Sequence, residues 1–238
     1  MPRFSPRNLL AAGVLAASAS LLSGGCADNE SMLFVRAVLA WPPGQCVINP
    51  DPTSLIRLGG VLDRAFRSNY IAPLLIGNQL TVRGDRDTLR TESSRITLRG
   101  AVVEIKDRQG NRLEHYTADG TGFVDPGDGS SPGFGLMSVE LIPPSANLPD
   151  NSDVIVGVRV FGDTLGGREI ESSELTFPIF VCQGCLVSFP AIAVDPLTLE
   201  CVGGEEPADP PPCVIGQDDA VDCRYCASST AACQQAPF

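Results

Sequence analysis

The chain has 238 residues, 43% of them hydrophobic, and a formal net charge of −11 at pH 7. Its acidic balance and its one lysine, Lys106, argue against binding to nucleic acid, which needs clustered lysine and arginine, and against electrostatic adhesion to anionic lipid. The hydrophobic content is enough for one core of moderate size, and the acidity is typical of a well-solvated surface domain.

Residues 1–25 have the pattern of a secretory signal peptide. Arg3 and Arg7 supply a positive end, residues 9–22 are apolar or small, and no acidic residue precedes Asp28. In such a signal the positive end stays in the cytoplasm, the apolar stretch enters the bilayer and small residues fit the peptidase. A spanning helix needs about 20 apolar residues and this stretch offers roughly 14, so we predict an export signal and not a permanent transmembrane helix.

The apolar stretch ends in the tetrad Ser23-Gly24-Gly25-Cys26. This tetrad resembles the lipobox of bacterial lipoproteins, although Ser23 replaces the usual leucine. The resemblance implies that the thiol of Cys26 carries a diacylglyceryl group and that Cys26 becomes the mature N-terminus. It also implies sorting to the outer membrane, because Ala27 and not aspartate follows the cysteine.

Residues 26–31 are therefore expected to form a lipid anchor and a short tether. A processed lipoprotein carries three acyl chains, and two or more are enough for stable anchoring. Residues 27–31 span at most roughly 17 Å when extended, which would keep the folded domain close to the headgroups. Removal of the signal takes away Arg3 and Arg7, two positive charges, and so changes the net charge from −11 to near −13.

Nine cysteines are present, an odd number that calls for an explanation in an exported protein. Lipidation of Cys26 would leave eight, enough for four disulfides. The disulfide candidates are Cys46, Cys182, Cys185, Cys201, Cys213, Cys223, Cys226 and Cys233. An oxidising compartment favours disulfides. Since eight cysteines allow 105 connectivities, no pairing is predicted.

Two Cys-x-x-Cys pairs leave zinc open as an alternative. Cys182 with Cys185, and Cys223 with Cys226, have the spacing of a zinc ribbon, although more residues than usual separate the two pairs. A thioredoxin-like redox role is weaker, because Cys182 follows strand-like residues and does not open a helix. For an exported chain we favour disulfides, and we predict no metal and no cofactor.

Residues 32–190 are predicted to form a single all-β domain. Strand-like patterns occur over residues 33–40 and 154–161, both with a period of two, and over residues 95–107; returning strands are predicted over residues 113–117 and 168–181. Proline and glycine separate these runs, and no helical pattern lies between them. We predict an antiparallel two-sheet sandwich of the Ig-like kind, with a small barrel as the alternative. Residues 55–80 fit neither a strand nor a helix period cleanly.

Residues 191–238 are predicted to form an acidic, cysteine-rich, irregular tail. They contain five of the nine cysteines, three consecutive prolines, and eight acidic residues against one basic residue, Arg224. Such a segment cannot bury enough apolar surface by itself, so we expect disulfides to hold it. Residues 222–234 are predicted to include a short helix that carries three cysteines.

Catalytic patterns are sparse. The one histidine, His115, lies on the return strand of a predicted hairpin, and neither a Gly-x-Ser-x-Gly elbow nor a P-loop occurs. A single tryptophan, Trp41, offers little aromatic surface to a sugar chain. Aspartates that could approach calcium occur in three loops, and we expect them to be solvated turns. They are Asp85, Asp87, Asp125, Asp128, Asp218, Asp219 and Asp222.

The chain as a whole, residues 158–189 included, also resembles cysteine-rich envelope lipoproteins of bacteria, a resemblance that implies no activity. We therefore expect a non-catalytic binding or structural module of the cell envelope, held in the bilayer through acylated Cys26 and contacting an envelope protein. The alternative is an exported hydrolase or carbohydrate-acting enzyme without a recognisable motif.

Overall fold

The computed structural model describes residues 32–42, 44–84, 92–202 and 207–236. Strands dominate them and helices are few and short, which confirms the all-β prediction. Within these ranges no helix is both long and apolar enough to cross a membrane. Cys26 and the predicted signal peptide lie outside the described residues, as do Asp85 and Asp87.

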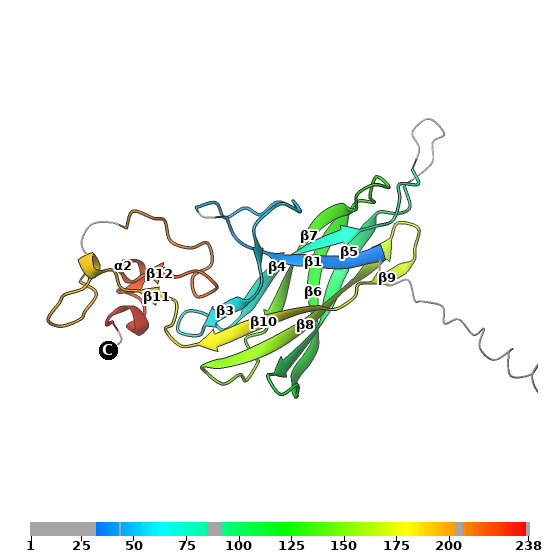
Figure 1. Cartoon of the computed structure of the whole chain (residues 1–238). Helices are drawn as coiled ribbons and strands as arrows, with labels where there is room; N and C mark the ends of the chain where they lie inside the picture. The colour runs from blue at the N-terminus through cyan, green and yellow to red at the C-terminus, as the bar shows by residue number, and fades with distance from the viewer. Residues whose placement is uncertain (1–31, 43, 85–91, 203–206, 237–238) are drawn as a thin grey trace, which may run out of the picture.

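Two sheets make up the body (Figure 1). The smaller sheet has the strand order β2-β1-β4-β7, and every pairing in it is antiparallel. Its strands are β1 (Leu33–Leu39), β2 (Ile56–Arg57), β4 (Tyr70–Asn78) and β7 (Gly133–Ile142). Strand β4 is buried along almost its whole length on both faces. Because a strand covered on both faces shows no alternation, residues 55–80 gave no clear period in the sequence.

The larger sheet has the order β3-β10-β8-β5-β6, with β9 paired to β8, and it curves into a half-barrel. Its strands are β3 (Gly60–Asp63), β5 (Ile96–Asp107), β6 (Arg112–Val124), β8 (Ser152–Thr164), β9 (Glu169–Glu171) and β10 (Leu175–Cys182). The hairpin predicted over residues 95–117 is confirmed as β5 and β6. One pairing departs from the antiparallel prediction, since β3 runs parallel to β10.

One hydrophobic core is shared by both sheets. Leu74 and Ile76 of β4 face it together with Val156 and Val158 of β8, and all four are completely buried. Burial of a valine, leucine or isoleucine side chain contributes about 1.5–3 kcal/mol, so this shared core is the main stabilisation of the body. The alternating valines of β8, identified in the sequence, lie here as expected.

The predicted alternation of β1 holds only for its first half. The pairing of β1 with β4 shifts register between Val35 and Ala37. Such a bulge moves the following residues to the opposite face. Val38, and not Ala37, therefore joins Leu33 in the shared core.

The tail and the residues just before it form a second, much smaller core. Strands β11 (Val187–Ser188) and β12 (Val221–Asp222) pair in parallel, and three one-turn helices accompany them. These helices are η3 (Ala191–Ala193), α2 (Cys223–Cys226) and η4 (Ala231–Cys233). The buried members of the small core are Ala193, Val221, Cys223, Cys226 and Cys233. Since cysteines are the majority, disulfides supply much of its interior, and the short helix expected in residues 222–234 is present as α2.

Hydrogen bonds from the backbone and from one side chain attach the tail to one end of the body. The amide of Asp218 donates to the carbonyl of Val61 at 2.9 Å, which extends the sheet beyond its edge strand β3. The Gln217 side chain accepts from the amide of Ile71 at 3.1 Å and donates to its carbonyl at 2.8 Å, so it contacts β4 of the other sheet. Residues 216–218 thus close the space between the two sheets at this end.

The chain enters the body at the opposite end. Leu33, the first residue of β1, pairs with Asn78 at the end of β4, whereas Ile71 near the start of β4 contacts the tail. In Figure 1 the tail accordingly extends from the end where β3 and β10 finish, away from the first residue of β1. We call this tail-bearing end the distal end.

Candidate functional site

The distal end carries a hollow of ≈ 350 Å³, which we name the Trp41 pocket. Trp41, Pro42 and Gly44, which follow β1, form one wall. Residues 209–213 of the tail, together with Asp219 and Ala220, form the other. Both the tail and the segment that follows β1 are therefore needed to form the pocket.

A disulfide holds the two walls of the Trp41 pocket together. Cys46 and Cys213 are 167 residues apart in the chain, and their Cα atoms lie 5.3 Å apart. The tail wall also contains three consecutive prolines, residues 210–212, whose rings fix their φ angles. A crosslink and a stiff wall give a pocket that is formed before any ligand arrives.

The charge of the Trp41 pocket is negative. Arg57 of β2 forms ion pairs with Asp218 at 3.3 Å and with Asp219 at 2.5 Å. Asp209, on the tail wall, is exposed and forms no ion pair with any residue in the described ranges. Of the two carboxylates that line the pocket, Asp219 has a cationic partner among the described residues and Asp209 has none, so an excess of negative charge lies at the pocket.

Asp218 is a buried carboxylate that joins the tail to both sheets. Its side chain, 4% exposed, accepts from the amide of Val61 at 2.9 Å and from the hydroxyl of Tyr70 at 3.0 Å. Burial raises the pKa of Asp218, and burial also raises the pKa of Tyr70. Both pKa values rise because the charged form of each group loses solvation when it is buried. We therefore assign Asp218 and Tyr70 a structural role behind the pocket.

The indole of Trp41 has an unusual environment. Its Nε1 atom is buried and has no hydrogen-bond partner among the described residues. A buried donor without a partner costs about 1–3 kcal/mol. Trp41 therefore contributes to the pocket through its indole ring and not through this N–H.

Two substitutions compare a polar hydrogen that makes no hydrogen bond, on Trp41, with one that does, on Tyr70. Trp41→Phe removes an N–H without a partner, which relieves its cost, and also removes part of the ring contact, so we expect the two effects to offset and the free energy of unfolding to change by less than about 1 kcal/mol. Tyr70→Phe removes the O–H that donates to Asp218, and we expect a loss of about 1–2 kcal/mol. Urea denaturation followed by far-ultraviolet circular dichroism measures both. A larger loss for Trp41→Phe than for Tyr70→Phe would contradict this account.

Comparisons with protein-family models, curated proteins and solved structures give no match to this chain. Its functional sites are therefore identified from their own geometry.

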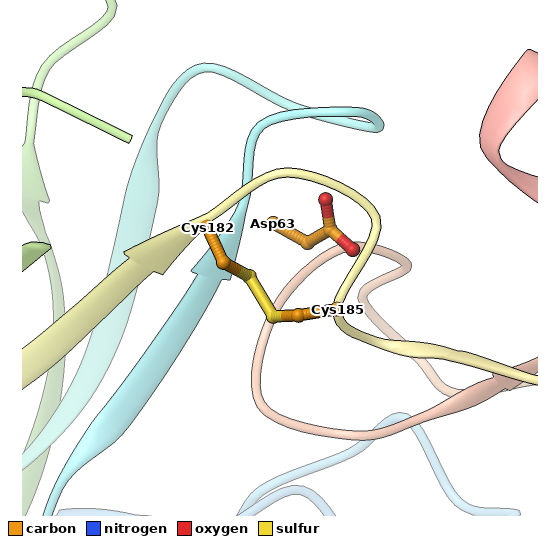
Figure 2. A group of neighbouring side chains, drawn as sticks. All are labelled: Asp63, Cys182 and Cys185. Carbon is orange, nitrogen blue, oxygen red and sulfur yellow. A yellow bond between two sulfur atoms is a disulfide. The ribbon is translucent and has the colours of Figure 1, made fainter. Parts of the chain in front are cut away.

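A second group lies where β3 and β10 end side by side. Figure 2 shows the carboxylate of Asp63 beside the disulfide between Cys182 and Cys185. Potential ligand atoms of these three residues lie within 4.8 Å of one another. Asp63 is fully buried and accepts from the amides of Gly184 at 2.6 Å and Leu186 at 2.9 Å. The carboxylate thereby holds the turn that contains the disulfide.

The chemistry of this second group is structural in the oxidised chain. A cysteine binds metal as a thiolate, and here the two sulfurs are bonded to each other while Asp63 is satisfied by backbone amides. Cys182 is fully buried and Cys185 is exposed. An incoming thiolate would therefore attack at Cys185, because exchange requires access to the sulfur.

The structure assigns the eight disulfide candidates to four pairs. These are Cys46–Cys213, Cys182–Cys185, Cys201–Cys223 and Cys226–Cys233. The two Cys-x-x-Cys pairs do not form one zinc site, because Cys223 and Cys226 have different partners in the small core. The predicted lipidation residue, Cys26, lies outside the described residues and stays a prediction.

His115 lies on the outer face of the larger sheet, in a hollow of ≈ 230 Å³. It is exposed and stands opposite Glu104, which is paired to Lys106 at 2.5 Å. Glu174 contributes a second carboxylate, in the space that Gly157 leaves open. No serine, threonine or cysteine lines this hollow, so its residues lack the nucleophile of a Ser-His-Asp arrangement.

The candidate calcium loops have other partners. Asp128 accepts from the amides of Ser130 and Ser131, at 2.8 and 2.7 Å, and Asp125 pairs with Arg95. The remaining described candidates, Asp218, Asp219 and Asp222, pair with arginines. The structure thus accounts for these carboxylates without an ion.

Sequence reasoning missed the importance of Trp41, Asp63 and Asp218. Trp41 was considered only as a sugar platform, and Asp218 only as a calcium candidate. The one available signal was the combination of an isolated tryptophan with a proline run and flanking aspartates. Nothing in the sequence indicated that these segments meet, because 167 residues separate the two cysteines that join them.

Proposed function

We propose that the chain is a lipid-anchored module of the bacterial cell envelope, held in the outer membrane through Cys26, with a non-catalytic binding or structural role. The observation that carries this proposal is the position of the tail. The body begins with Leu33 at one end, and the disulfide-linked tail with the Trp41 pocket lies at the other. An anchor just before residue 32 would therefore present the pocket away from the bilayer, toward other envelope components.

The cysteines support export independently of the signal peptide. Four pairs at disulfide distance use all eight cysteines after Cys26 and leave none over. Disulfides persist in oxidising compartments and are rare in the cytosol. We further propose that the body is an Ig-like two-sheet sandwich whose larger sheet is strongly curved. The shared core between a four-stranded and a six-stranded sheet supports this description.

Intact-mass spectrometry of the protein purified from membranes tests the anchor. We expect a mature chain that begins at Cys26, carries three acyl chains and has lost eight hydrogens to disulfides. A Cys26→Ser variant should lack the lipid, because serine offers no thiol to accept the diacylglyceryl group. A Ser23→Ala variant serves as the control and should remain lipidated. An unlipidated natural chain, or a mature N-terminus at another residue, would refute the proposal.

A further inference from the structure

We propose that the Trp41 pocket binds an arginine side chain on an exposed segment of a partner protein. The inference rests on the proposed binding role of the chain, and it does not depend on the lipid anchor. Three features carry it: an excess of negative charge in the pocket, an aromatic and proline-rich lining, and exposed apolar side chains on the neighbouring segments.

The charge of the pocket selects a cation. Asp209 and Asp219 lie on its tail wall, and Arg57, the guanidinium that pairs with Asp219, is shared with the buried Asp218. The Asp219 side chain is 45% exposed, so it remains accessible to a second cation. Clefts lined by one sign of charge concentrate ligands of the opposite sign.

The lining of the pocket favours a planar cationic group that is carried on an alkyl stem. Trp41 and the prolines of residues 210–212 offer rings against which an alkyl stem can pack. A guanidinium suits this combination better than an ammonium does, because it is planar, weakly hydrated, stacks on aromatic rings and pairs with carboxylates in a two-pronged manner. Arginine therefore fits both the acidic and the aromatic part of the lining.

Exposed apolar side chains on the segments next to the pocket favour a protein partner over a free small molecule. Leu55 is 68% exposed and its carbonyl accepts from the amide of Ala40, next to Trp41. Ile56 is 51% exposed on β2, and Val47 is 67% exposed next to Cys46. Exposed apolar side chains on neighbouring segments are characteristic of protein interaction sites. They would contact the residues that flank the bound arginine.

Preorganisation makes the site suitable for recognition. The Cys46–Cys213 disulfide and the proline wall keep the pocket formed in the free chain. Binding then needs little ordering of the pocket, which lowers the entropic cost of association. A loosely held loop with the same side chains would bind arginine less well.

Fluorescence gives a direct test, because Trp41 is the one tryptophan in the chain. The oxidised protein is titrated with N-acetyl-arginine methylamide and with its uncharged isostere, N-acetyl-citrulline methylamide. We expect a saturable change in Trp41 emission with the arginine compound and a weaker response to citrulline. The Asp209→Asn/Asp219→Asn double variant should weaken the affinity for the arginine compound roughly three- to tenfold. An Asp119→Asn variant, which removes an exposed carboxylate outside the pocket, should leave it unchanged.

A second pair of probes tests the protein partner. The peptide acetyl-Leu-Arg-Leu-amide should bind more tightly than acetyl-Gly-Arg-Gly-amide, and an Ile56→Ser variant should reduce that difference. Equal binding of the two peptides would overturn the assignment to a protein segment. Absence of a saturable response, an equal response to citrulline, or equal effects of Asp119→Asn and the double variant would overturn the arginine site itself. Mass spectrometry of the same preparation reports the lipid separately, so failure of either proposal is distinguishable.

Discussion

Replacement of both Cys46 and Cys213 by serine is expected to lower the free energy of unfolding by about 5 kcal/mol. This disulfide closes a loop of 167 residues, by far the longest of the four. The loss follows from chain entropy, because a crosslink restricts the unfolded chain more when the loop it closes is longer. The same change separates the two walls of the Trp41 pocket, so the emission of Trp41 should shift toward that of a solvated indole.

The matched control is the Cys182→Ser/Cys185→Ser variant. The two residues are three apart in sequence, and the same entropy relation gives about 2 kcal/mol for so short a loop. Urea denaturation followed by circular dichroism measures both losses, and Trp41 emission in the absence of urea reports the pocket. Equal losses for the two double variants would contradict the dominant stabilising role of the Cys46–Cys213 disulfide. An unchanged Trp41 emission after its removal would contradict its role in forming the pocket.

Replacement of Asp218 by alanine is expected to destabilise the chain by about 3 kcal/mol. The change removes the acceptor of the Tyr70 hydroxyl and of the Val61 amide, and it removes one partner of Arg57. Deleting one member of a buried ion pair is costly because it leaves desolvated groups without partners. Asp219→Ala, at a neighbouring and half-exposed position, is the control and should cost about 0.5 kcal/mol. Similar losses for the two variants would contradict the central position assigned to Asp218.

The same carboxylate gives the stability a defined pH dependence. Burial raises the pKa of Asp218, so the native state holds this proton more firmly than the unfolded chain does. The resulting stabilisation is fully present below the unfolded pKa of about 3.9 and is lost as the pH rises through the higher folded pKa. The stability of the natural chain relative to Asp218→Asn should therefore fall with rising pH above about 4 and then level off. Urea titrations of both chains at successive pH values measure this difference, and an increase over that range would contradict it.

The sequence predicted the strands best where one face is buried. The alternating valines of β8 and the β5–β6 hairpin are where the pattern placed them, because one face of each strand meets the core and the other meets solvent. The alternation of side chains did not predict β4, which is buried on both faces. It also did not predict which residues of the second half of β1 are buried, because a bulge there reverses the two faces. The return strand over residues 168–181 is divided into β9 and β10, with Ser172 between them accepting from the amide of Val160.

The candidate site could not be predicted in the same way. Its parts come from residues just after β1 and from the tail, and no local pattern connects them. Even the pairing of Cys46 with Cys213 was one of many connectivities that the cysteine count allowed. Gly216, with φ of 82°, lies in the turn that directs the tail across the body, and a side chain there would meet Phe66. Such a requirement is visible only when both segments are in place.

The sequence by itself determined the class of this protein: an acidic, β-rich chain with eight cysteines after a lipobox-like Cys26. These properties depend on composition and on the period of side chains along one strand, which a linear chain records directly. Only the tertiary structure decided which cysteines pair, which faces of β1 are buried, and that Trp41 meets a wall of prolines and aspartates. These features depend on contacts between segments far apart in the chain, and the free energy of packing the whole body selects them, not the preferences of any one segment.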